Sequence, residues 1–509
     1  MAISKHFPTP TTAQQLGSLI KSARDIMRKD KGLSGELDRL PMLVWIMFLK
    51  FLDDSERLFE QEAKLAGKRY HPTVEPPYRW RDWAAGKDSL TGDALISFIN
   101  QEEAVRPDGT KGQGLFAYLR GLEGTGKTRK DVIANVFRGT VNRMISGYLL
   151  RDLIDKVGCI HFDSTEEMQT LGHLYESMLR EMRDAAGDSG EFYTPRSVVQ
   201  FMVRVIDPKI GESVLDPACG TGGFLAEAFS YMSKSCKTVQ QRDILQEKAI
   251  YGQEAKPLPY LLSEMNLLLH GLEFPNIKYG NTLSQKLTEI GDAQRVDIVL
   301  TNPPFGGEEE AAIKSNFPAD MQTSETALLF LQYIMRKLRR PNAKSDGGRA
   351  AVVVPNGTLF GDSVCARIKQ DLLKDFDLHT IVRLPGGVFA PYTSIPTNIL
   401  FFNQGGPTKQ IWFYEIPMPE GRKNYTKTQP MPFSEFEPCI AWWSKRKATP
   451  QAWKVSAKEL LDDNCNFDRK NPSAKDDPSH LPPEKLIESI LAKELKIVEL
   501  VKEIKRSIT

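Results

Sequence analysis

Cysteine, histidine and net charge are all low in this sequence, and each shortage excludes a class of protein. The six cysteines form no C-x-x-C pair and the seven histidines form no ligand-spaced cluster, so we expect neither a disulfide framework nor a structural metal. The net charge is only +2. Contact with an acidic partner must therefore rest on local basic patches or on another subunit.

Long apolar runs are also missing. The longest patch, Met42 to Leu52, is interrupted by Lys50 and is too short to cross a bilayer. The first residues do not combine a basic start with a long apolar stretch. We therefore expect a cytoplasmic protein without membrane contact. At 509 residues the chain can hold two or three domains, each with its own core.

The first third of the chain has the spacing of amphipathic helices. Its first helical face carries apolar residues at three- and four-residue steps: Leu16, Leu19, Ile20, Ala23, Ile26 and Met27. Residues 40–59 form a second such run. We predict an N-terminal all-helical domain over residues 1–165.

Strand and helix patterns alternate from residue 166 to residue 470. The candidate strands are short apolar runs at 213–217, 249–254, 277–280, 296–301, 349–355, 379–384 and 397–403. This alternation predicts an α/β domain with a seven-stranded, doubly wound sheet over residues 166–470. Residues 471–509 are predicted to form a polar linker and one apolar-striped helix, Leu486 to Ile504.

The most informative motif is D-I-V-L-T-N-P-P-F, in which an apolar run ends in Asn302, Pro303, Pro304 and Phe305. Proline fixes φ and supplies no N–H donor, so the chain must leave the sheet here as a stiff loop. Such a loop offers a carboxamide oxygen, a backbone carbonyl and a flat ring. Together these groups suit a planar ligand that carries an amino group.

A second motif precedes it, S-V-L-D-P-A-C-G-T-G-G-F-L from Ser213 to Leu225. A short apolar run, an acid, a glycine-rich turn and a helical pattern describe the first strand, loop and helix of a nucleotide-binding α/β domain. The spacing differs from the dinucleotide fingerprint, and Asp216 would repel a pyrophosphate. This acid instead suits a ligand with a cationic amino group, such as the methionine part of S-adenosylmethionine.

The two motifs together resemble those of the S-adenosylmethionine-dependent, adenine-specific DNA methyltransferases. The chain most resembles the modification subunits of type I restriction-modification systems, because the likeness extends to the helical N-terminal segment, to the stretch from Gly190 to Arg196 and to the C-terminal helix. The resemblance implies a Rossmann-like domain whose last strand is antiparallel. It also implies partners: double-stranded DNA, a specificity subunit that reads the target sequence, a second copy of this chain in a two-to-one complex, and a restriction subunit.

The expected cofactor site gathers residues from four segments. The glycine-rich turn supplies Asp216, Ala218, Gly220, Thr221, Gly222 and Gly223, and its glycines let the backbone approach a ligand closely. Glu254 ends the second strand, where a carboxylate can accept both ribose hydroxyls, although its distance from the turn exceeds the ~20 residues of dinucleotide folds. An ordinary solvated acid at a strand end is the alternative.

The resemblance assigns the remaining cofactor residues. Asn281 follows the third strand, where many methyltransferases have an aspartate that holds the adenine amino group, and an asparagine oxygen can accept the same hydrogen bond. The family also implies that Glu191, Phe192, Tyr193 and Thr194 fold over the methionine end of the cofactor. A simple helix start at Pro195 is the alternative for that segment.

The chemistry of adenine gives the NPPF residues their expected roles. The exocyclic amine is a poor nucleophile because its lone pair is delocalised into the ring. The Asn302 carboxamide oxygen and the Pro303 carbonyl oxygen can each accept one amino hydrogen, while Phe305 stacks on the base. A base inside a duplex cannot reach such a pocket, so the target adenine must be flipped out. Methyl transfer then depends on positioning and electrostatics, without a covalent intermediate.

Three alternatives remain open. Gly121 to Thr128 fits the phosphate-loop pattern G-x-x-x-x-G-K-[ST] and would make the chain a nucleotide triphosphatase, although the preceding residues 115–120 do not look like a buried strand. Enzymes that methylate a protein glutamine amide use a similar Asn-Pro-Pro-aromatic motif. A scaffold subunit that has lost its activity is the third alternative, and the intact motifs argue against it.

Two basic clusters could contact DNA phosphates. The first comprises Arg336, Lys337, Arg339, Arg340 and Lys344, and the second comprises Lys445, Arg446 and Lys447. Charge runs are usually solvated faces, which is the alternative for both.

Overall fold

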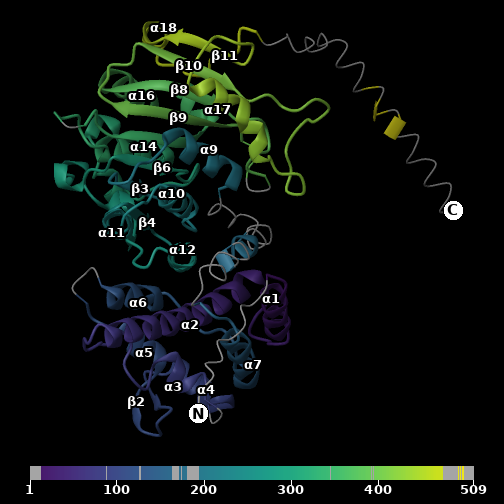
Figure 1. The fold of residues 1–509 in the computed structure, drawn as a ribbon. Helices are drawn as coiled ribbons and strands as arrows, with labels where there is room; N and C mark the ends of the chain where they lie inside the picture. Colours follow the sequence, from purple (N-terminus) through teal and green to yellow (C-terminus); the bar gives the residue numbers. More distant parts are fainter. Residues whose placement is uncertain are drawn as a thin grey trace, which may run out of the picture.

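A computed structural model describes residues 13–86, 89–124, 128–162, 171–172, 175–179, 194–343, 345–390, 393, 395–473, 491, 493–494 and 496–497. Two regions follow one another along the chain. The helical region is residues 13–158 and the sheet region is residues 194–473. Figure 1 shows the helices of the first region packed below the sheet of the second. The predicted boundary at residue 165 and most of the predicted C-terminal helix lie outside the described residues.

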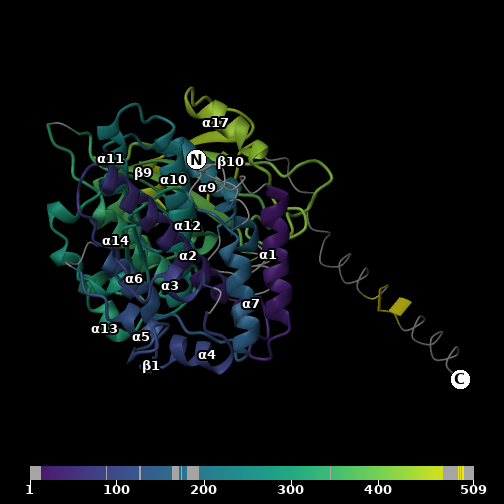
Figure 2. The same ribbon diagram turned by 60° about the horizontal axis from the view of Figure 1, so that its bottom comes forward.

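The helical region is built around one long helix. Its helices are α1 (Ala13–Arg28), α2 (Glu36–Leu65), α3 (Trp80–Trp83), α4 (Gly92–Asn100), α5 (Leu115–Arg120), α6 (Arg129–Arg138) and α7 (Gly147–Gly158). Figure 2 shows α1 and α7 lying side by side. The region is not all-helical as predicted, because β1 (Glu103–Val105) and β2 (Lys111–Gln113) form an antiparallel hairpin. Both strands are too short for an alternating pattern to predict them.

Helix α2 carries the apolar patch that Lys50 interrupts. This lysine is buried and forms an ion pair with Asp54, one turn further along the same helix. Asp53, also buried, pairs with Arg81 at 2.7 Å. The charges within the patch are therefore paired inside the protein, as buried charges must be. Among the described residues, no helix is long and apolar enough to cross a membrane.

The sheet region contains one nine-stranded sheet in the order β11-β10-β8-β9-β7-β6-β3-β4-β5. Its strands are β3 (Val214–Asp216), β4 (Ile250–Glu254), β5 (Ile277–Tyr279), β6 (Ile298–Thr301), β7 (Arg349–Pro355), β8 (Phe376–Arg383), β9 (Thr397–Gln404), β10 (Gln410–Glu415) and β11 (Ala452–Ser456). All seven predicted strands are present, and β9 is antiparallel to both of its neighbours. The prediction missed β10 and β11, whose short runs mix aromatic residues with polar ones.

Helices cover both faces of the sheet, as a largely parallel sheet requires. One face packs against α9 (Arg196–Ile206), α10 (Gly223–Ser233), α12 (Pro257–Leu269) and α17 (Glu437–Trp443). The other packs against α14 (Thr326–Lys337), α16 (Val364–Asp375) and α18 (Ala457–Asp462). Three further helices, α11 (Val239–Lys248), α13 (Ala311–Lys314) and α15 (Asn356–Phe360), lie in the connections. In β6, Ile298 and Leu300 face the first layer and Val299 faces the second.

Helix α12 joins the two regions. It packs against α2 and α6 of the helical region (Figure 1). The end of α6 and the start of α12 lie close together at Gly139, where an added Cβ would lie 2.5 Å from Pro257 Cβ. Tyr175 adds a buried hydrogen bond, donated by its hydroxyl to the Leu262 carbonyl oxygen at 3.0 Å. The same helix therefore contacts both the helical region and the sheet.

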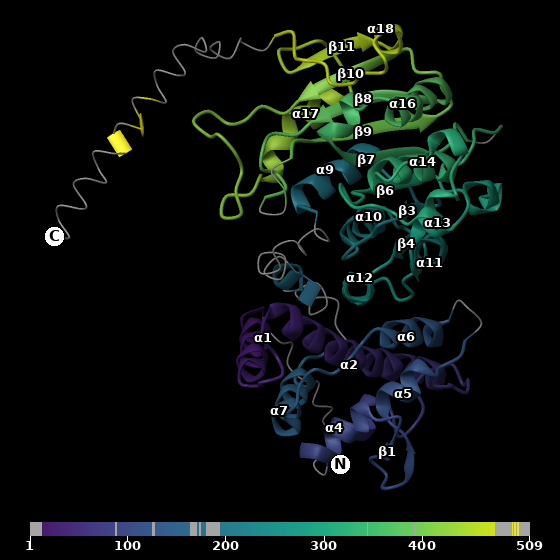
Figure 3. The ribbon, with the colours of Figure 1, turned by 180° about the vertical axis from the view of Figure 1, so that it is seen from behind.

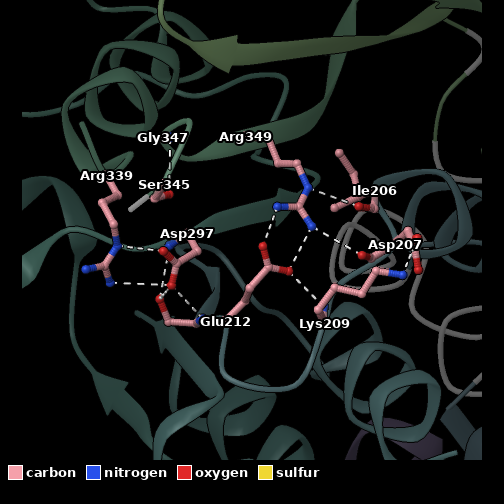
Figure 4. Close-up of polar contacts among 10 residues, drawn as sticks. Ile206, Asp207, Lys209, Glu212, Asp297, Arg339, Ser345, Gly347 and Arg349 are labelled. Atoms are coloured by element: carbon pink, nitrogen blue, oxygen red, sulfur yellow. Dashed lines mark hydrogen bonds and ion pairs between the residues drawn. The ribbon is translucent and has the colours of Figure 1, made fainter. Parts of the chain in front are cut away.

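Ion pairs fix the amino ends of the central strands (Figure 4). At the start of β7, Arg349 pairs with Glu212 at 2.6 Å, and its guanidinium also donates to the carbonyl oxygens of Ile206 and Asp207. Asp297, just before β6, accepts from Ser213 and pairs with Arg339 at 2.6 Å. These contacts tie the edge of the sheet that lies opposite the carboxyl ends of the parallel strands.

Candidate active site at the carboxyl edge of the sheet

The strand order places a ligand site between β3 and β6. β3 pairs with β4 on one side and with β6 on the other, so the order of the parallel strands reverses at this point. Ligands of doubly wound sheets bind at such switch points, outside the carboxyl ends of the strands. Asp216 ends β3 and Asn302 follows β6. The two motifs therefore meet at this point of the sheet.

A cavity of about 330 Å³ opens at this edge. The predicted site residues in its wall are Thr194, Asp216, Ala218, Gly220, Thr221, Gly223, Glu254, Asn281, Asn302 and Pro304. Gly222, Pro303 and Phe305 adjoin these residues in the chain but do not line the cavity. Glu191, Phe192 and Tyr193 lie outside the described residues.

The glycine-rich turn has a conformation that depends on its glycines. Gly220 and Gly222 have φ values of 53° and 75°, which side chains rarely tolerate. An added Cβ on Gly222 would also lie 3.2 Å from Ser263 Cβ on α12. From the same helix, Asn266 Nδ2 donates to the Thr221 carbonyl oxygen at 2.8 Å. Helix α12 thus holds the turn from behind.

Asp216 is fully buried beside the cavity. Burial raises the pKa of its carboxyl to about 7, and hydrogen bonds from the Thr301 hydroxyl and the Ala218 N–H oppose that rise. Their lengths are 2.7 Å and 3.1 Å, and both reach Asp216 Oδ1. A buried carboxylate without a cation is unfavourable. The side chain is therefore suited to a cationic group in the cavity.

Glu254 reaches the same cavity from the end of β4. Its Oε2 accepts from the Gly220 N–H at 2.9 Å and its Oε1 from the Lys256 N–H at 2.8 Å. Burial raises the pKa of this carboxyl, and the backbone donors oppose the rise. Each oxygen keeps a second lone pair for a ligand hydroxyl.

The Asn281 side chain makes two hydrogen bonds within the protein. Its Oδ1 accepts from the Leu283 N–H at 2.9 Å, and its Nδ2 donates to Glu309 Oε2 at 3.2 Å. The oxygen can still accept one further hydrogen bond. Glu309, which also lines the cavity, adds a carboxylate that we did not predict.

Asn302 presents a free acceptor. Its Nδ2 donates to Thr194 Oγ1 at 3.2 Å, which orients the amide. Its Oδ1 is buried and has no hydrogen-bond partner among the described residues. An unsatisfied buried acceptor costs about 1–3 kcal/mol, so a donor from a ligand would be favourable here.

Phe305 contacts a second aromatic ring. It meets Phe389 edge to face, with ring centroids 5.8 Å apart. Phe389 lies in the loop after β8, a strand whose carboxyl end is at the same edge of the sheet as β3 and β6. The sequence reasoning missed Phe389, although its place after a predicted strand was a usable signal.

The phosphate-loop interpretation of Gly121 to Thr128 lacks its structural context. The preceding segment is helix α5 rather than a strand, and the Thr128 hydroxyl donates to Asp131 at 2.7 Å within a capping box at the start of α6. A phosphate loop needs a strand before it and a free hydroxyl for magnesium. Lys127 lies outside the described residues.

This site and sheet define the class of the protein. A glycine-rich turn after the first strand of a doubly wound sheet, an acid at the end of the second strand and an antiparallel strand inserted beyond β7 form the fold of an S-adenosylmethionine-dependent methyltransferase.

Comparison with known proteins agrees and goes further. Residues 166–480 match the N-6 DNA methylase family, and residues 16–157 match the HsdM N-terminal domain. The methylase subunit of the type I restriction enzyme EcoEI from Escherichia coli is 47% identical over 92% of this chain and 93% of its own length. The chain belongs to the N-6 DNA methylase family, in the branch of type I restriction enzyme methylase subunits.

Two solved structures are similar over nearly the whole chain. A Vibrio vulnificus protein assigned as the modification subunit of a type I restriction enzyme is 64% identical, with a TM-score of 0.84, and the match covers 93% of this chain and 100% of that one. A chain from a structural study of complex assembly in a type I restriction-modification system is 37% identical, with a TM-score of 0.80 and coverage of 97% and 98%.

Proposed function

We propose that this chain transfers a methyl group from S-adenosylmethionine to the exocyclic amino group of adenine in DNA. The observation that carries the proposal is the Asn302 carboxamide, whose nitrogen is held by Thr194 while its buried oxygen lacks a partner among the described residues. This oxygen is a fixed acceptor for an amino hydrogen. Family membership supports the same substrate.

The residues of the cavity fit S-adenosylmethionine. Asp216 offers a buried carboxyl for the methionine ammonium group, and Glu254 offers lone pairs for the ribose hydroxyls. The positive-φ glycines keep side chains away from the ligand. Asn281 and Glu309 are polar residues of the same cavity wall and offer hydrogen-bond partners for the adenine ring of the cofactor. The bound cofactor would supply an electrophilic methyl group on sulfur.

The NPPF residues hold the target. Asn302 and the Pro303 carbonyl oxygen each accept one amino hydrogen of the flipped base and so weaken its conjugation with the ring. Phe305 stacks on the base, and Phe389 supports Phe305 from the side. These contacts strengthen as the amine becomes tetrahedral, which favours the transition state over the ground state.

We further infer that the chain acts as the modification subunit of a type I complex. A specificity subunit would read the DNA sequence, a second copy of this chain would complete a two-to-one assembly, and a restriction subunit would join it. Two observations support this inference. One similar structure comes from a study of complex assembly in a type I restriction-modification system, and the EcoEI relative is a type I methylase subunit. A DNA substrate also implies a cytoplasmic location. The domain limits 1–165, 166–470 and 471–509 belong to the same proposal.

Substitution of Asn302 tests the proposed chemistry. We expect Asn302→Ala to lower methyl incorporation into DNA by at least a hundredfold, while calorimetry finds S-adenosylmethionine affinity within about twofold of the wild type. The matched control is Gln240→Ala, which removes an exposed amide on α11, outside the cavity. Near-normal turnover of the Asn302→Ala enzyme would contradict the catalytic role.

A further inference from the structure

A basic loop leaves the sheet at the same edge as the active site. This loop, residues 417–430, follows β10, which runs parallel to β8 and therefore ends at the carboxyl edge with β3 and β6. Figures 1 and 3 show it projecting beyond the sheet, away from the covering helices. The basic loop and the cavity therefore lie at the same edge of the sheet.

The charge of the basic loop is mainly positive. It contains Arg422, Lys423 and Lys427 against a single acid, Glu420. Lys423 is exposed, and Arg422 lies over the Tyr425 ring with its guanidinium 4.9 Å from the ring centroid. Lys423 is therefore at the surface, and the buried Tyr425 ring holds the neighbouring Arg422 side chain in place.

Tyr425 attaches the basic loop to the loop that follows β8. The tyrosine is buried, and its backbone N–H donates to the Gly386 carbonyl oxygen at 3.0 Å. At Gly387, φ is 78° and an added Cβ would lie 2.2 Å from the Tyr425 carbonyl oxygen. Two residues further on, Phe389 contacts Phe305. A short chain of direct contacts therefore joins the basic loop to the NPPF motif.

In both basic clusters that the sequence analysis named, some of the cations make contacts within the protein. Arg339 pairs with Asp297 near the amino ends of the strands (Figure 4). Lys337 donates to the Gln294 carbonyl oxygen at 3.1 Å. In the second cluster, Arg446 lies over the Trp443 ring, 4.9 Å from its centroid. Arg340, Lys445 and Lys447 are exposed as well. The basic loop combines exposed charge with the contacts that lead through Tyr425 and Phe389 to Phe305.

We propose that the basic loop binds the phosphates of DNA beside the flipped adenine. The inference rests on the proposed function, because the active site determines where the DNA must run. Phosphate contacts position a protein on DNA, and each one releases a counterion, so that log affinity falls with log salt by about 0.9 per contact. Arg422 and Lys423 would hold the strand while its base lies against Phe305.

Salt-dependent DNA binding tests the proposal. The full chain, assembled with its specificity subunit, would be titrated onto a labelled duplex that carries the site mapped by methylome sequencing. We expect Arg422→Ala with Lys423→Ala to weaken binding at least tenfold near 100 mM salt and to reduce the salt slope by about two. S-adenosylmethionine affinity, measured on the same sample, should not change, which also shows that the variant is folded.

Two further variants separate charge from structure. Arg422→Lys with Lys423→Arg keeps both charges and should keep the salt slope. Lys237→Ala with Lys248→Ala removes two exposed cations, one just before α11 and one at its last residue, both outside the cavity, and should bind DNA as the wild type does. An unchanged salt slope in the Arg422 and Lys423 alanine variant would overturn the proposal.

Two other outcomes identify different failures. If that alanine variant no longer assembles with the specificity subunit in light scattering, the basic loop is a protein interface and the proposal is overturned. If the wild-type complex binds S-adenosylmethionine but does not methylate adenine, the proposed function fails. The salt slopes would still decide whether the basic loop contacts DNA.

Discussion

The Thr301 hydroxyl donates a 2.7 Å hydrogen bond to Asp216 Oδ1. This contact links the strand that precedes the NPPF motif to the acid that begins the glycine-rich turn. Both groups are buried, so the hydrogen bond is shielded from water and fixes the carboxyl orientation. The cofactor side and the target side of the site are therefore not independent.

Cofactor affinity should depend on pH through Asp216. Burial raises the pKa of this carboxyl to about 7 in the free protein, and a bound ammonium group would favour its ionised form. Below pH 7 the ligand must displace a proton, so we expect the Kd for S-adenosylmethionine to rise as pH falls, by up to about tenfold per unit.

Calorimetry from pH 5.5 to 8.5 measures this dependence. Asp216→Asn should bind at least tenfold more weakly at pH 8, ~1.4 kcal/mol, and should lose the pH dependence. A wild-type affinity that is constant across the range would contradict the assigned role of Asp216.

Two glycines, one in the glycine-rich turn and one outside the cavity, give a matched test of the turn. Gly222 has a positive φ and packs against Ser263, so Gly222→Val should distort the turn and weaken S-adenosylmethionine binding at least tenfold. Gly291 is exposed and lies outside the cavity, its φ is -84°, and an added Cβ there would meet nothing within 4 Å. Gly291→Ala should therefore bind the cofactor about as well as the wild type. Equal losses in both variants would argue against a specific role for the Gly222 conformation.

Substitutions at the amino ends of the central strands should lower the stability of the protein without changing its affinity for S-adenosylmethionine. Arg349→Ala removes a donor from two backbone carbonyls and the ion-pair partner of Glu212, which keeps the Lys209 N–H. We therefore expect the free energy of unfolding to fall by about 1–3 kcal/mol. Arg349→Lys keeps the charge but not the forked geometry and should recover only part of the loss. Urea unfolding measures both. A large fall in cofactor affinity for either variant, with stability intact, would show that the edge acts on the site.

The sequence was sufficient for strands and motifs that depend on local pattern. Asp216 and Asn302 follow buried apolar runs, and parallel strands bring their carboxyl ends to one edge, so both could be placed together. β10 and β11 were missed because pairing with other strands fixes them: β10 pairs with β8, and β11 pairs with β10.

The missed site residues share one cause. Phe389 and Asn266 lie far along the chain from the residues that they contact. Glu309 is close to the NPPF motif in the sequence, but its hydrogen bond is with Asn281, on the other side of β6 in the chain. Only tertiary packing makes these three contacts. Thr301 stands directly before Asn302, but its hydrogen bond crosses from β6 to Asp216 at the end of β3. The hydrophobic periodicity and the composition of a sequence predict local structure and carry no information about such contacts.

Asn266 should act as a positioning residue for the glycine-rich turn. It is buried on α12, and its Nδ2 donates to the Thr221 carbonyl oxygen, so it has no place in the cavity wall itself. Asn266→Ala leaves that carbonyl without the Asn266 donor, and we expect S-adenosylmethionine to bind about five- to 150-fold more weakly, in line with the ~1–3 kcal/mol of an unsatisfied buried group.

The kinetics separate this role from a catalytic one. Because Asn266 acts on the cofactor turn alone, the Asn266→Ala enzyme should regain nearly the wild-type methylation rate at saturating S-adenosylmethionine, so that KM rises while kcat changes little. Asn266→Gln tests whether any amide on α12 suffices. Its longer side chain cannot keep the 2.8 Å hydrogen bond without moving the turn, so it should not restore affinity. A fall in kcat with unchanged KM in the alanine variant would instead place Asn266 in the chemistry of methyl transfer.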